Sequence, residues 1–394
     1  MFNPERDDRR LAELRLAALD VSPVAGLTHC HYKYPARFSP KFVSAVLKEF
    51  SKPGDLVLDP YMGGGTTIVE AMAGGRRAVG CDLNSLAVFV TRAKTTSLTN
   101  MDERQICAWA TAVVPSLSYH DTDHRLKEAL CEKRTRNLHL PHARPIKKFI
   151  ALALVSLDAL DSVQAKEFAR CALLNASQWA LNGRKKHVAL SDFRARLTRV
   201  SLEMLQASAS LRSAKQASCQ SDVFSSLIHD SAENLSSHYP FSSGDRADLV
   251  VTSPPYPGVH ILYHRWQVNG RRETPAPYWI ANCLDGKGES YYTFGTRKEN
   301  QHDEYFKQSL RTLESIRSVM KDGAVMAQMI AFSKPRSQLK RYLDNMSKAG
   351  FKEIRTSSGR PARAWRDVPG RSWHASLQGS THSAREVALF HVAV

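Results

Sequence analysis

The stretch that decides the fold runs from Asp248 to Tyr256 and reads DLVVTSPPY. Its first half is an apolar run typical of a buried strand, and its second half holds a polar residue, two prolines and an aromatic ring. Because proline lacks an N–H and fixes φ, the strand must end before Pro254. The segment therefore predicts a rigid corner at the carboxyl end of a strand, where open α/β sheets bind their ligands.

Side chains at this corner suit a planar base that carries an amino group. Ser253 and the backbone carbonyl of Pro254 can accept hydrogen bonds from an amine, and Tyr256 offers a flat face for stacking. With Pro255, the segment resembles the catalytic motif of amino-methylating DNA methyltransferases, which transfer a methyl group from S-adenosylmethionine to an exocyclic nitrogen. In that family the serine form is mostly associated with cytosine N4, and Asp or Asn in its place with adenine N6. The alternative interpretation is a Ser-Pro-Pro turn with a core tyrosine.

Upstream, residues 56–67 read LVLDPYMGGGTT and predict a buried strand, a glycine turn and the start of a helix. This order opens a nucleotide-binding βαβ unit, in which glycines allow close backbone approach and the helix start directs N–H groups at the ligand. The missing Gly-Lys-Ser/Thr ending excludes a Walker phosphate loop. A glycine-rich turn used only for packing is the alternative.

The same run resembles the cofactor loop of the amino-methyltransferases, Asp-Pro-Phe-x-Gly-x-Gly-Thr-Thr, with a tyrosine in place of the phenylalanine. The resemblance assigns cofactor contacts to Asp59, Pro60, Tyr61, Gly63, Gly65, Thr66 and Thr67. It implies that Asp59 faces the cationic methionine end of the cofactor.

Further cofactor contacts are expected from three other segments. A second predicted strand ends at Asp82 and Leu83, about twenty residues after the glycines, which is the spacing of a ribose-binding carboxylate. Asp230 follows a strand that resembles the one contacting the cofactor adenine. The aromatic and basic loop 29–42 resembles the family's motif before the cofactor loop, and its Arg37, Phe38 and Pro40 are carried over as cofactor contacts. Its two histidines are not predicted to bind metal, since no acid or cysteine lies at a useful spacing.

Composition narrows the choice of partner. The 394 residues carry a formal net charge of +17, which favours a polyanion, most commonly nucleic acid. The longest apolar run, 149–157, is too short to span a bilayer, and we find no secretory or lipidation signal. We therefore expect a cytoplasmic protein with double-stranded DNA as its partner, a possible cognate restriction endonuclease or defence system, and no membrane partner.

The seven cysteines are scattered and include no C-x-x-C pair, so neither a zinc site nor a redox site is predicted. Methylation at cytosine C5 needs a thiolate nucleophile, normally presented after a proline. No Pro-Cys pair occurs in the sequence, which argues against that chemistry.

The predicted organisation is a methyltransferase domain interrupted by a helical module. Residues 1–100 hold the cofactor loop, residues 101–221 form the insertion, and residues 222–394 form the catalytic part. The insertion has helical apolar periodicity and two basic clusters. They comprise Lys133, Arg134, Arg136, Arg144, Lys147 and Lys148, and Arg184, Lys185, Lys186, Arg194, Arg196 and Arg199. In one arrangement of the family this position carries target recognition, so we expect phosphate or base contacts, with a solvated helical face as the alternative.

After the corner comes a long segment in which aromatic and basic residues alternate. It contains Tyr263, His264, Arg265, Trp266, Arg271, Arg272, Tyr278, Trp279, Tyr291, Tyr292, Phe294 and Arg297. Interleaved rings and cations suit an extruded base or a splayed strand, and a buried aromatic cluster is the alternative. The later strands and helices resemble the rest of a Rossmann-like methyltransferase sheet, α/β and mostly parallel with an antiparallel edge hairpin.

Together these motifs predict a site-specific DNA methyltransferase that flips a base and methylates cytosine N4 with S-adenosylmethionine, without a covalent intermediate. Adenine N6 methylation is the nearest alternative, followed by methylation of an RNA base. A catalytically silent DNA-binding module is the alternative from another class, and the intact motif residues argue against it. The sequence does not indicate the recognition site or the oligomeric state.

Overall fold

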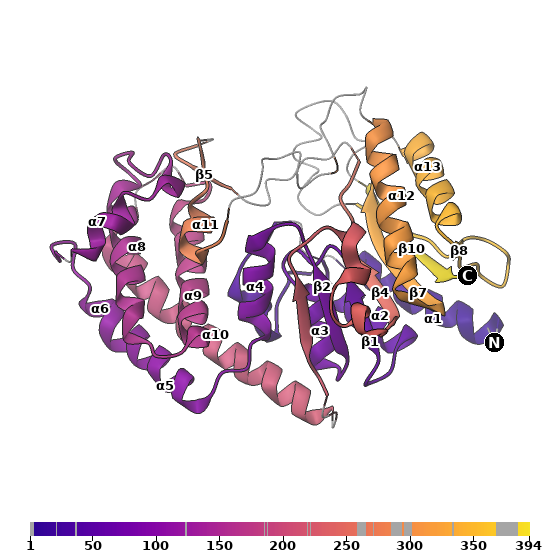
Figure 1. Cartoon of the computed structure of the whole chain (residues 1–394), viewed down its shortest axis with the longest axis horizontal. Helices are drawn as coiled ribbons and strands as arrows, with labels where there is room; N and C mark the ends of the chain where they lie inside the picture. Colours follow the sequence, from indigo (N-terminus) through magenta and orange to yellow (C-terminus); the bar gives the residue numbers. More distant parts are fainter. Residues whose placement is uncertain are drawn as a thin grey trace.

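A computed structural model describes residues 4–20, 22–35, 38–122, 124–184, 186, 188–218, 220, 222–257, 265–270, 272–284, 294, 302–332, 335–367 and 385–394; for residues 4–8 and 302 only the backbone is described. Figure 1 shows two bodies side by side, a helical module and a domain built around a sheet.

The sheet has the order β3-β2-β1-β4-β7-β10-β8, with β9 also paired to β10. Its strands are β1 (Leu56–Asp59), β2 (Arg77–Cys81), β3 (Ser225–Ile228), β4 (Ala247–Thr252), β7 (Met320–Ala331), β8 (Phe351–Glu353), β9 (Ala364–Asp367) and β10 (Arg385–Ala393). The first five in spatial order are parallel, and β10 runs antiparallel to β7, β8 and β9. This confirms the expected mostly parallel sheet with an antiparallel edge.

The helices of the sheet domain are α1 (Pro4–Leu19), η1 (Leu27–His31), α2 (Pro40–Phe50), α3 (Thr66–Ala73), α4 (Ser85–Thr95), η5 (Ala232–Ser237), η6 (Phe241–Ser243), α12 (His302–Ser318) and α13 (Pro335–Lys348). The helices of the module are α5 (Asn100–Ala108), η2 (Trp109–Val113), α6 (Val114–Ser116), α7 (Arg125–Leu130), η3 (Lys133–Thr135), α8 (Arg144–Ser156), η4 (Leu157–Ala159), α9 (Val163–Leu181) and α10 (Leu190–Ala217). Within the described part of the chain, no helix combines the length and hydropathy needed to cross a bilayer.

Side-chain alternation along the strands supplies a core on each face of the sheet. Leu58 and Val250 point toward the face that α12 and α13 cover, whereas Val57, Leu249 and Val251 point toward α1, α2 and α3. Successive side chains of a strand face opposite ways, and parallel strands are buried on both sides, so these strands are apolar throughout. The result is a three-layer αβα domain.

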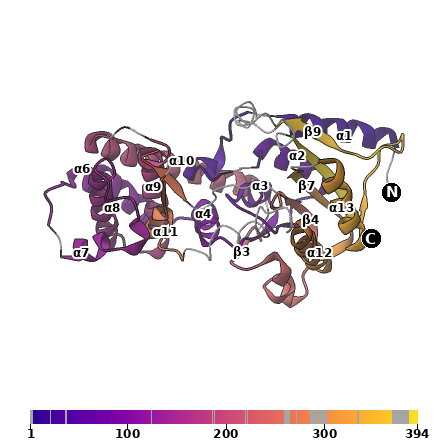
Figure 2. The ribbon, with the colours of Figure 1, turned by 90° about the horizontal axis from the view of Figure 1, so that it is seen from above.

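The helical module has its own core, which α4 of the sheet domain also enters through Leu86, Phe89 and Val90. The hairpin β5 (Trp266–Val268) and β6 (Arg272–Thr274) and the helix α11 (Ala276–Ala281) join this core as well, although they follow β4 in the chain. Figures 1 and 2 show α11 beside α9, and α10 running from the module back toward α3. The domain boundaries drawn from the sequence stay a prediction, and the structure places residues 266–268 and 276–281 on the module.

Several element bounds differ from the sequence-based expectation. The sequence pattern predicts a strand at 324–330 that follows the residues Lys321, Asp322 and Gly323, whereas β7 begins at Met320 and includes those three residues. The basic region near residue 190 forms one helix of 28 residues, α10. Its apolar positions are widely spaced, which gives a weak periodic signal, and it packs on α9 of the module and on α3 of the sheet domain.

The glycine turn before α3 gives the first prediction. Gly65 has φ +74°, and an added Cβ would lie 2.5 Å from Thr91 Oγ1 and 2.6 Å from its Cγ2. Gly65→Ala combines a left-handed backbone with a clash, so we expect it to lower the free energy of unfolding by about 2–4 kcal/mol. The control is Gly323→Ala. Gly323 also has a positive φ, +77°, but an added Cβ there would have no atom within 4 Å, so this variant should lower the free energy of unfolding by about 1 kcal/mol. Urea unfolding of both variants checks this, and equal losses would contradict the packing role.

Candidate active site and cofactor pocket

A pocket lies at the carboxyl ends of β1, β2, β3 and β4. The described residues that line it are Tyr34, Pro35, Phe38, Asp59, Pro60, Tyr61, Met62, Gly63, Gly64, Thr66, Asp82, Leu83, Asn84, Asp230, Ser231, Ala232, Ser253, Pro255, Tyr256 and Phe294. Four parallel strands end at the same edge, which is where ligands bind in open α/β sheets. The pocket thus brings together the glycine loop, both strand-end acids and the Ser-Pro-Pro-Tyr corner.

Asp59 is the buried carboxylate at the end of β1, with 3% of its surface exposed. Its Oδ1 accepts hydrogen bonds from Thr252 Oγ1 (2.6 Å) and from the Tyr61 amide (3.1 Å). Burial raises the pKa of Asp59 to about 6, although these donors favour its ionised form, and the nearby charge of Asp82 adds to the rise. The ionised group is therefore under-compensated and suits a cationic or donor-rich ligand.

Asp82 provides a second carboxylate at the end of β2. Its two oxygens accept the amides of Asn84 (2.8 Å) and Gly63 (2.9 Å), so this side chain holds the glycine loop against the next turn. Burial raises the pKa of Asp82 to about 6, and the two amide donors only partly oppose that rise. The pocket thus contains two acids that a ligand with several donors can ionise.

The glycine loop is supported from behind by α4. Lys94, 1% exposed, donates from Nζ to the Gly64 carbonyl (2.6 Å), and Thr91 Oγ1 lies 3.4 Å from the Gly63 carbonyl. A Cβ on Gly64 would lie 2.8 Å from Tyr34 Cβ, so the loop fits tightly between Tyr34 and α4. The close fit fixes the backbone N–H groups that precede α3.

The Ser-Pro-Pro-Tyr corner is held on both sides. Ser253 Oγ lies 3.1 Å from the Tyr256 hydroxyl, and both side chains are partly exposed to the pocket. The Tyr305 hydroxyl of α12 donates to the Pro255 carbonyl (2.7 Å). The preceding residue, Thr252, donates to Asp59, so the corner and the start of the glycine loop are joined by a direct hydrogen bond.

Asp230 lines the pocket, but its carboxylate also organises the turn that follows. It accepts hydrogen bonds from the Ser231 amide (2.7 Å), His238 Nε2 (2.8 Å) and Asn234 Nδ2 (3.1 Å). Burial opposes ionisation of Asp230, but these donors outweigh it and the pKa is lowered. Its side chain is therefore an ionised anchor of η5, and an adenine contact stays a prediction.

Most of the residues predicted for the site line this one pocket. The predicted residues among its lining are Phe38, Asp59, Pro60, Tyr61, Gly63, Thr66, Asp82, Leu83, Asp230, Ser253, Pro255 and Tyr256. Pro40, Gly65, Thr67 and Pro254 do not line it: Pro40 begins α2, Gly65 caps α3, Thr67 donates to the Val251 carbonyl (3.2 Å) and Pro254 is buried. Arg37 lies outside the described residues. The chemical roles assigned to all of them stay predictions.

Sequence reasoning missed several residues around the pocket. Tyr34 lies in the aromatic loop from which Arg37, Phe38 and Pro40 were selected. Asn84 also lines the pocket, and it caps α4 by accepting the Leu86 amide (3.0 Å). Phe294 completes an apolar wall with its ring 5.8 Å from that of Tyr61. Lys94 carried no signal, because a lysine in a helix is ordinarily a surface residue.

Three aromatic residues of the segment after the corner do not have the base-stacking role expected for that segment. Trp266, Tyr278 and Trp279 are buried in the core of the helical module, with at most 5% of their surface exposed, so they offer no stacking face for a base. The rings fill the space between α9, α4 and the hairpin because a small module needs large apolar side chains to build a core. Tyr263, His264, Arg271, Tyr291, Tyr292 and Arg297 lie outside the described residues.

Part of the module's positive charge is used inside the chain. Lys147 donates to the Leu130 carbonyl (2.7 Å), and Lys148 donates to the Tyr119 carbonyl and lies over its ring. Arg184 and Arg196 lie over the Trp179 ring, at 4.6 and 5.9 Å from its centroid. By contrast, Lys133, Arg136 and Arg144 are exposed near the start of α8. Phosphate contact by the module stays a prediction, and these three residues fit it better than Lys147.

The sheet has a Rossmann-like arrangement, and part of the chain is similar in sequence to known proteins. Residues 15–90 match the N6/N4 methyltransferase family model, described as DNA methylase. Over 75 residues the chain is 37% identical to the type II methyltransferase M.MvaI of Kocuria varians, covering 18% of this chain and 16% of that protein. Over 68 residues it is 34% identical to the type II methyltransferase M.MjaII of Methanocaldococcus jannaschii, covering 17% of this chain and 13% of that protein.

These matches make the part of the chain around the glycine loop similar to amino DNA methyltransferases. The chain spans less than a fifth of the length of these relatives, and the family model covers the glycine loop and Asp82 but not the Ser-Pro-Pro-Tyr corner. Among solved structures, the rRNA methyltransferase AviRa of Streptomyces viridochromogenes aligns over 96% of this chain and 92% of its own, at 11% identity and a TM-score of 0.37. A score this low carries no argument about function.

The pKa of Asp59 gives the second prediction. With its pKa raised to about 6, the folded protein keeps a proton that the unfolded chain loses above pH 4, so stability falls as the pH rises from about 4 to about 6. Asp59→Asn keeps the acceptor for Thr252 and cannot ionise. We expect the free energy of unfolding of Asp59→Asn, relative to that of the parent, to rise by about 1 kcal/mol or more between pH 5 and pH 7.5.

Thermal unfolding of the ligand-free proteins at the two pH values measures this difference. Asp121→Asn, at an exposed position, is the control and should show no such rise. A difference that is independent of pH would contradict a buried, under-compensated Asp59.

Proposed function

We propose that this protein is a DNA methyltransferase that uses S-adenosylmethionine to methylate an exocyclic base amine, cytosine N4 in preference to adenine N6. The observation that carries the proposal is the single pocket in which the glycine loop, the acids Asp59 and Asp82 and the Ser253–Tyr256 corner meet. The family match supports DNA as the substrate, and the serine at the corner favours cytosine N4.

The residues of the pocket fit S-adenosylmethionine. The cofactor carries an ammonium group and ribose hydroxyls, which are the donors that two under-compensated carboxylates, Asp59 and Asp82, require. Leu83 and Phe294 provide apolar surface for the adenine, and Gly63 and Gly64 leave room for close backbone approach. When bound, the cofactor supplies an electrophilic methyl group.

The corner supplies orientation. An exocyclic amine has its lone pair delocalised into the ring, and accepting its hydrogen bonds at Ser253 and the Pro254 carbonyl pulls the nitrogen toward tetrahedral geometry. Transfer is then mainly a matter of alignment, and the amine loses its proton afterwards. Since the target base is stacked in a duplex, it must be flipped at a cost of a few kcal/mol, which stacking on Tyr256 partly offsets.

The experiment is to incubate the purified protein with S-adenosylmethionine and unmethylated genomic DNA, digest the DNA to nucleosides and analyse their masses. We expect N4-methylcytosine in the parent. N6-methyladenine would select the alternative base, and no methylated base would contradict the proposal. In a parallel incubation with RNA, methylation of RNA alone would exclude DNA as the substrate.

Variants at the corner give the third prediction. Ser253→Ala should slow methyl transfer roughly tenfold to a hundredfold, with cofactor affinity retained, because a hydrogen bond of about 1.5–3 kcal/mol is lost at the reacting amine. Tyr256→Ala should lose about 1–3 kcal/mol of stacking, whereas Tyr256→Phe keeps the ring and loses the 3.1 Å contact with Ser253.

Single-turnover methylation and a fluorescent base analogue at the target position separate these effects. If Tyr256→Ala flips and methylates as the parent does, Tyr256 is a packing residue and the site lies elsewhere. Unchanged transfer in Ser253→Ala would remove Ser253 from the mechanism.

The exposed cations near η3 give the fourth prediction. Charge reversal in the double variant Lys133→Glu, Arg136→Glu should weaken binding to unrelated duplexes equally and reduce the slope of log affinity against log salt by about 2. The matched control reverses Lys52 and Arg246, exposed before β1 and β4 at the edge of the sheet opposite the pocket. Salt titrations of duplex binding measure both, and equal losses in the two variants would contradict a specific DNA-binding side.

A further inference from the structure

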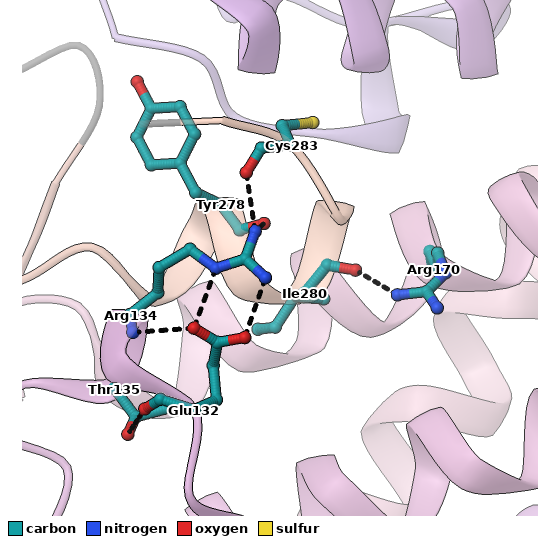
Figure 3. Close-up of polar contacts among 7 residues, drawn as sticks. All are labelled: Glu132, Arg134, Thr135, Arg170, Tyr278, Ile280 and Cys283. Carbon is teal, nitrogen blue, oxygen red and sulfur yellow. Dashed lines mark hydrogen bonds and ion pairs between the residues drawn. The ribbon is translucent and has the colours of Figure 1, made fainter. Parts of the chain in front are cut away.

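The position of α11 depends on tertiary contacts. It has only six residues, and helices this short are not stable alone in water. The last carbonyls of a helix lack partners within it, and here the module supplies them. Figure 3 shows two arginines of the module, Arg134 and Arg170, approaching the carboxyl end of α11.

Arg134 makes the larger set of contacts. Its Nη1 donates to the Cys283 carbonyl (2.7 Å) and to the Tyr278 carbonyl (3.3 Å), while its Nε and Nη2 form a bidentate pair with Glu132 (3.0 and 2.7 Å). A planar guanidinium held by a carboxylate in this way has little freedom, so the carbonyls it binds are held as well.

Arg170 of α9 adds a second point of attachment. Its Nη1 donates to the Ile280 carbonyl (3.0 Å), so three carbonyls at the end of α11 are bound by arginines from two elements of the module. The apolar face of α11 is buried in the module's core. Apolar packing and the arginine hydrogen bonds therefore both hold the helix on the module.

The Tyr278 side chain of α11 contacts Asn84, a residue that lines the pocket. Tyr278 is fully buried, and its hydroxyl donates to Asn84 Oδ1 (2.8 Å). The same oxygen accepts the Leu86 amide (3.0 Å), and Asn84 Nδ2 donates to the Tyr34 hydroxyl (3.1 Å). Asn84 and Tyr34 both line the pocket, and the Asn84 amide binds Asp82. The arginines hold the backbone of α11, the Tyr278 hydroxyl of α11 binds the Asn84 side chain, and the Asn84 backbone N–H binds Asp82, so a series of contacts joins the module's arginines to the candidate ribose carboxylate.

We propose that Arg134 and Arg170 are positioning residues: they hold α11 on the module so that the Tyr278 hydroxyl fixes Asn84, and with it Asp82, at the cofactor pocket. This proposal rests on the proposed function only for the identity of the ligand, S-adenosylmethionine, that the pocket binds. It makes the cofactor site depend on contacts in the module, and a second contact, from Ser85 Oγ to the Leu284 carbonyl (2.6 Å), joins the same two segments.

The chain offers matched controls for both variants. Arg363 forms a bidentate pair with Glu353 (2.6 and 2.8 Å) at the far edge of the sheet, with its side chain 24% exposed against 27% for Arg134. Tyr342 is a buried tyrosine whose hydroxyl donates to Gln328 Oε1 (2.6 Å) between α13 and β7. Arg363→Leu and Tyr342→Phe therefore remove a bidentate Arg–Glu pair and a buried tyrosine hydrogen bond whose partners are Glu353 and Gln328, not Asn84 or Asp82.

The first readout is hydrogen exchange in the ligand-free protein. Arg134→Leu and Tyr278→Phe should each speed exchange of the Asn84 and Leu86 amides several-fold, and neither control should. Tyr278→Phe keeps the ring in the core, so it tests the series even if Arg134→Leu does not fold. Unchanged exchange in Tyr278→Phe would overturn the proposal.

The second readout is calorimetry with S-adenosylmethionine. Each variant should weaken affinity about three- to tenfold, and Arg134→Leu with Tyr278→Phe should weaken it no further than the larger single effect, because both act through one series. Faster exchange with unchanged affinity, or additive effects, would also overturn the proposal. If the parent does not bind S-adenosylmethionine, the proposed cofactor is wrong, and the exchange result alone decides whether the arginines position Asn84.

Discussion

The hydrogen bond from Thr252 Oγ1 to Asp59 Oδ1 joins the ends of β4 and β1, and the arrangement of the pocket depends on it. The two strands are parallel and adjacent, with Leu58 opposite Val250, so both strands end at the same level of the sheet. A buried carboxylate requires donors, and the strand that carries the Ser-Pro-Pro-Tyr corner supplies one. The corner therefore cannot move without disturbing the acid at the head of the glycine loop.

The core of the helical module and the core on the α1, α2 and α3 face of the sheet both include side chains of α4. Its Val88 faces the sheet, whereas Phe89 and Val90 face the helical module, and its buried Lys94 holds the Gly64 carbonyl. A helix apolar around most of its surface is buried on most sides. Because interiors are close-packed, a displacement of the module is transmitted through α4 to the glycine loop. The helical insertion is therefore part of the construction of the pocket as well as a separate body.

Local patterns were sufficient for much of the fold. The apolar runs of β1 and β4, the glycine turn before α3 and the Pro-Pro stop are features of adjacent residues, and each was placed correctly. The candidate pocket was largely predictable for the same reason, since carboxyl ends of neighbouring parallel strands converge. Phe38, which comes from outside that unit, followed from the family resemblance instead. Trp266 and Tyr278 were ambiguous, because aromatic residues between basic ones suit either a stacking surface or a core.

Local residue types specify where the chain turns and which polar side chains stand at the strand ends, because those features follow from φ restriction, glycine freedom and the period of two along a strand. The partners of those side chains depend on how distant segments pack. Lys94, Arg134 and Arg170 look alike in sequence as helical or loop cations, yet each binds carbonyls from a distant segment. Burial and hydrogen bonding between remote segments depend on which surfaces pack together, and no local pattern encodes that choice.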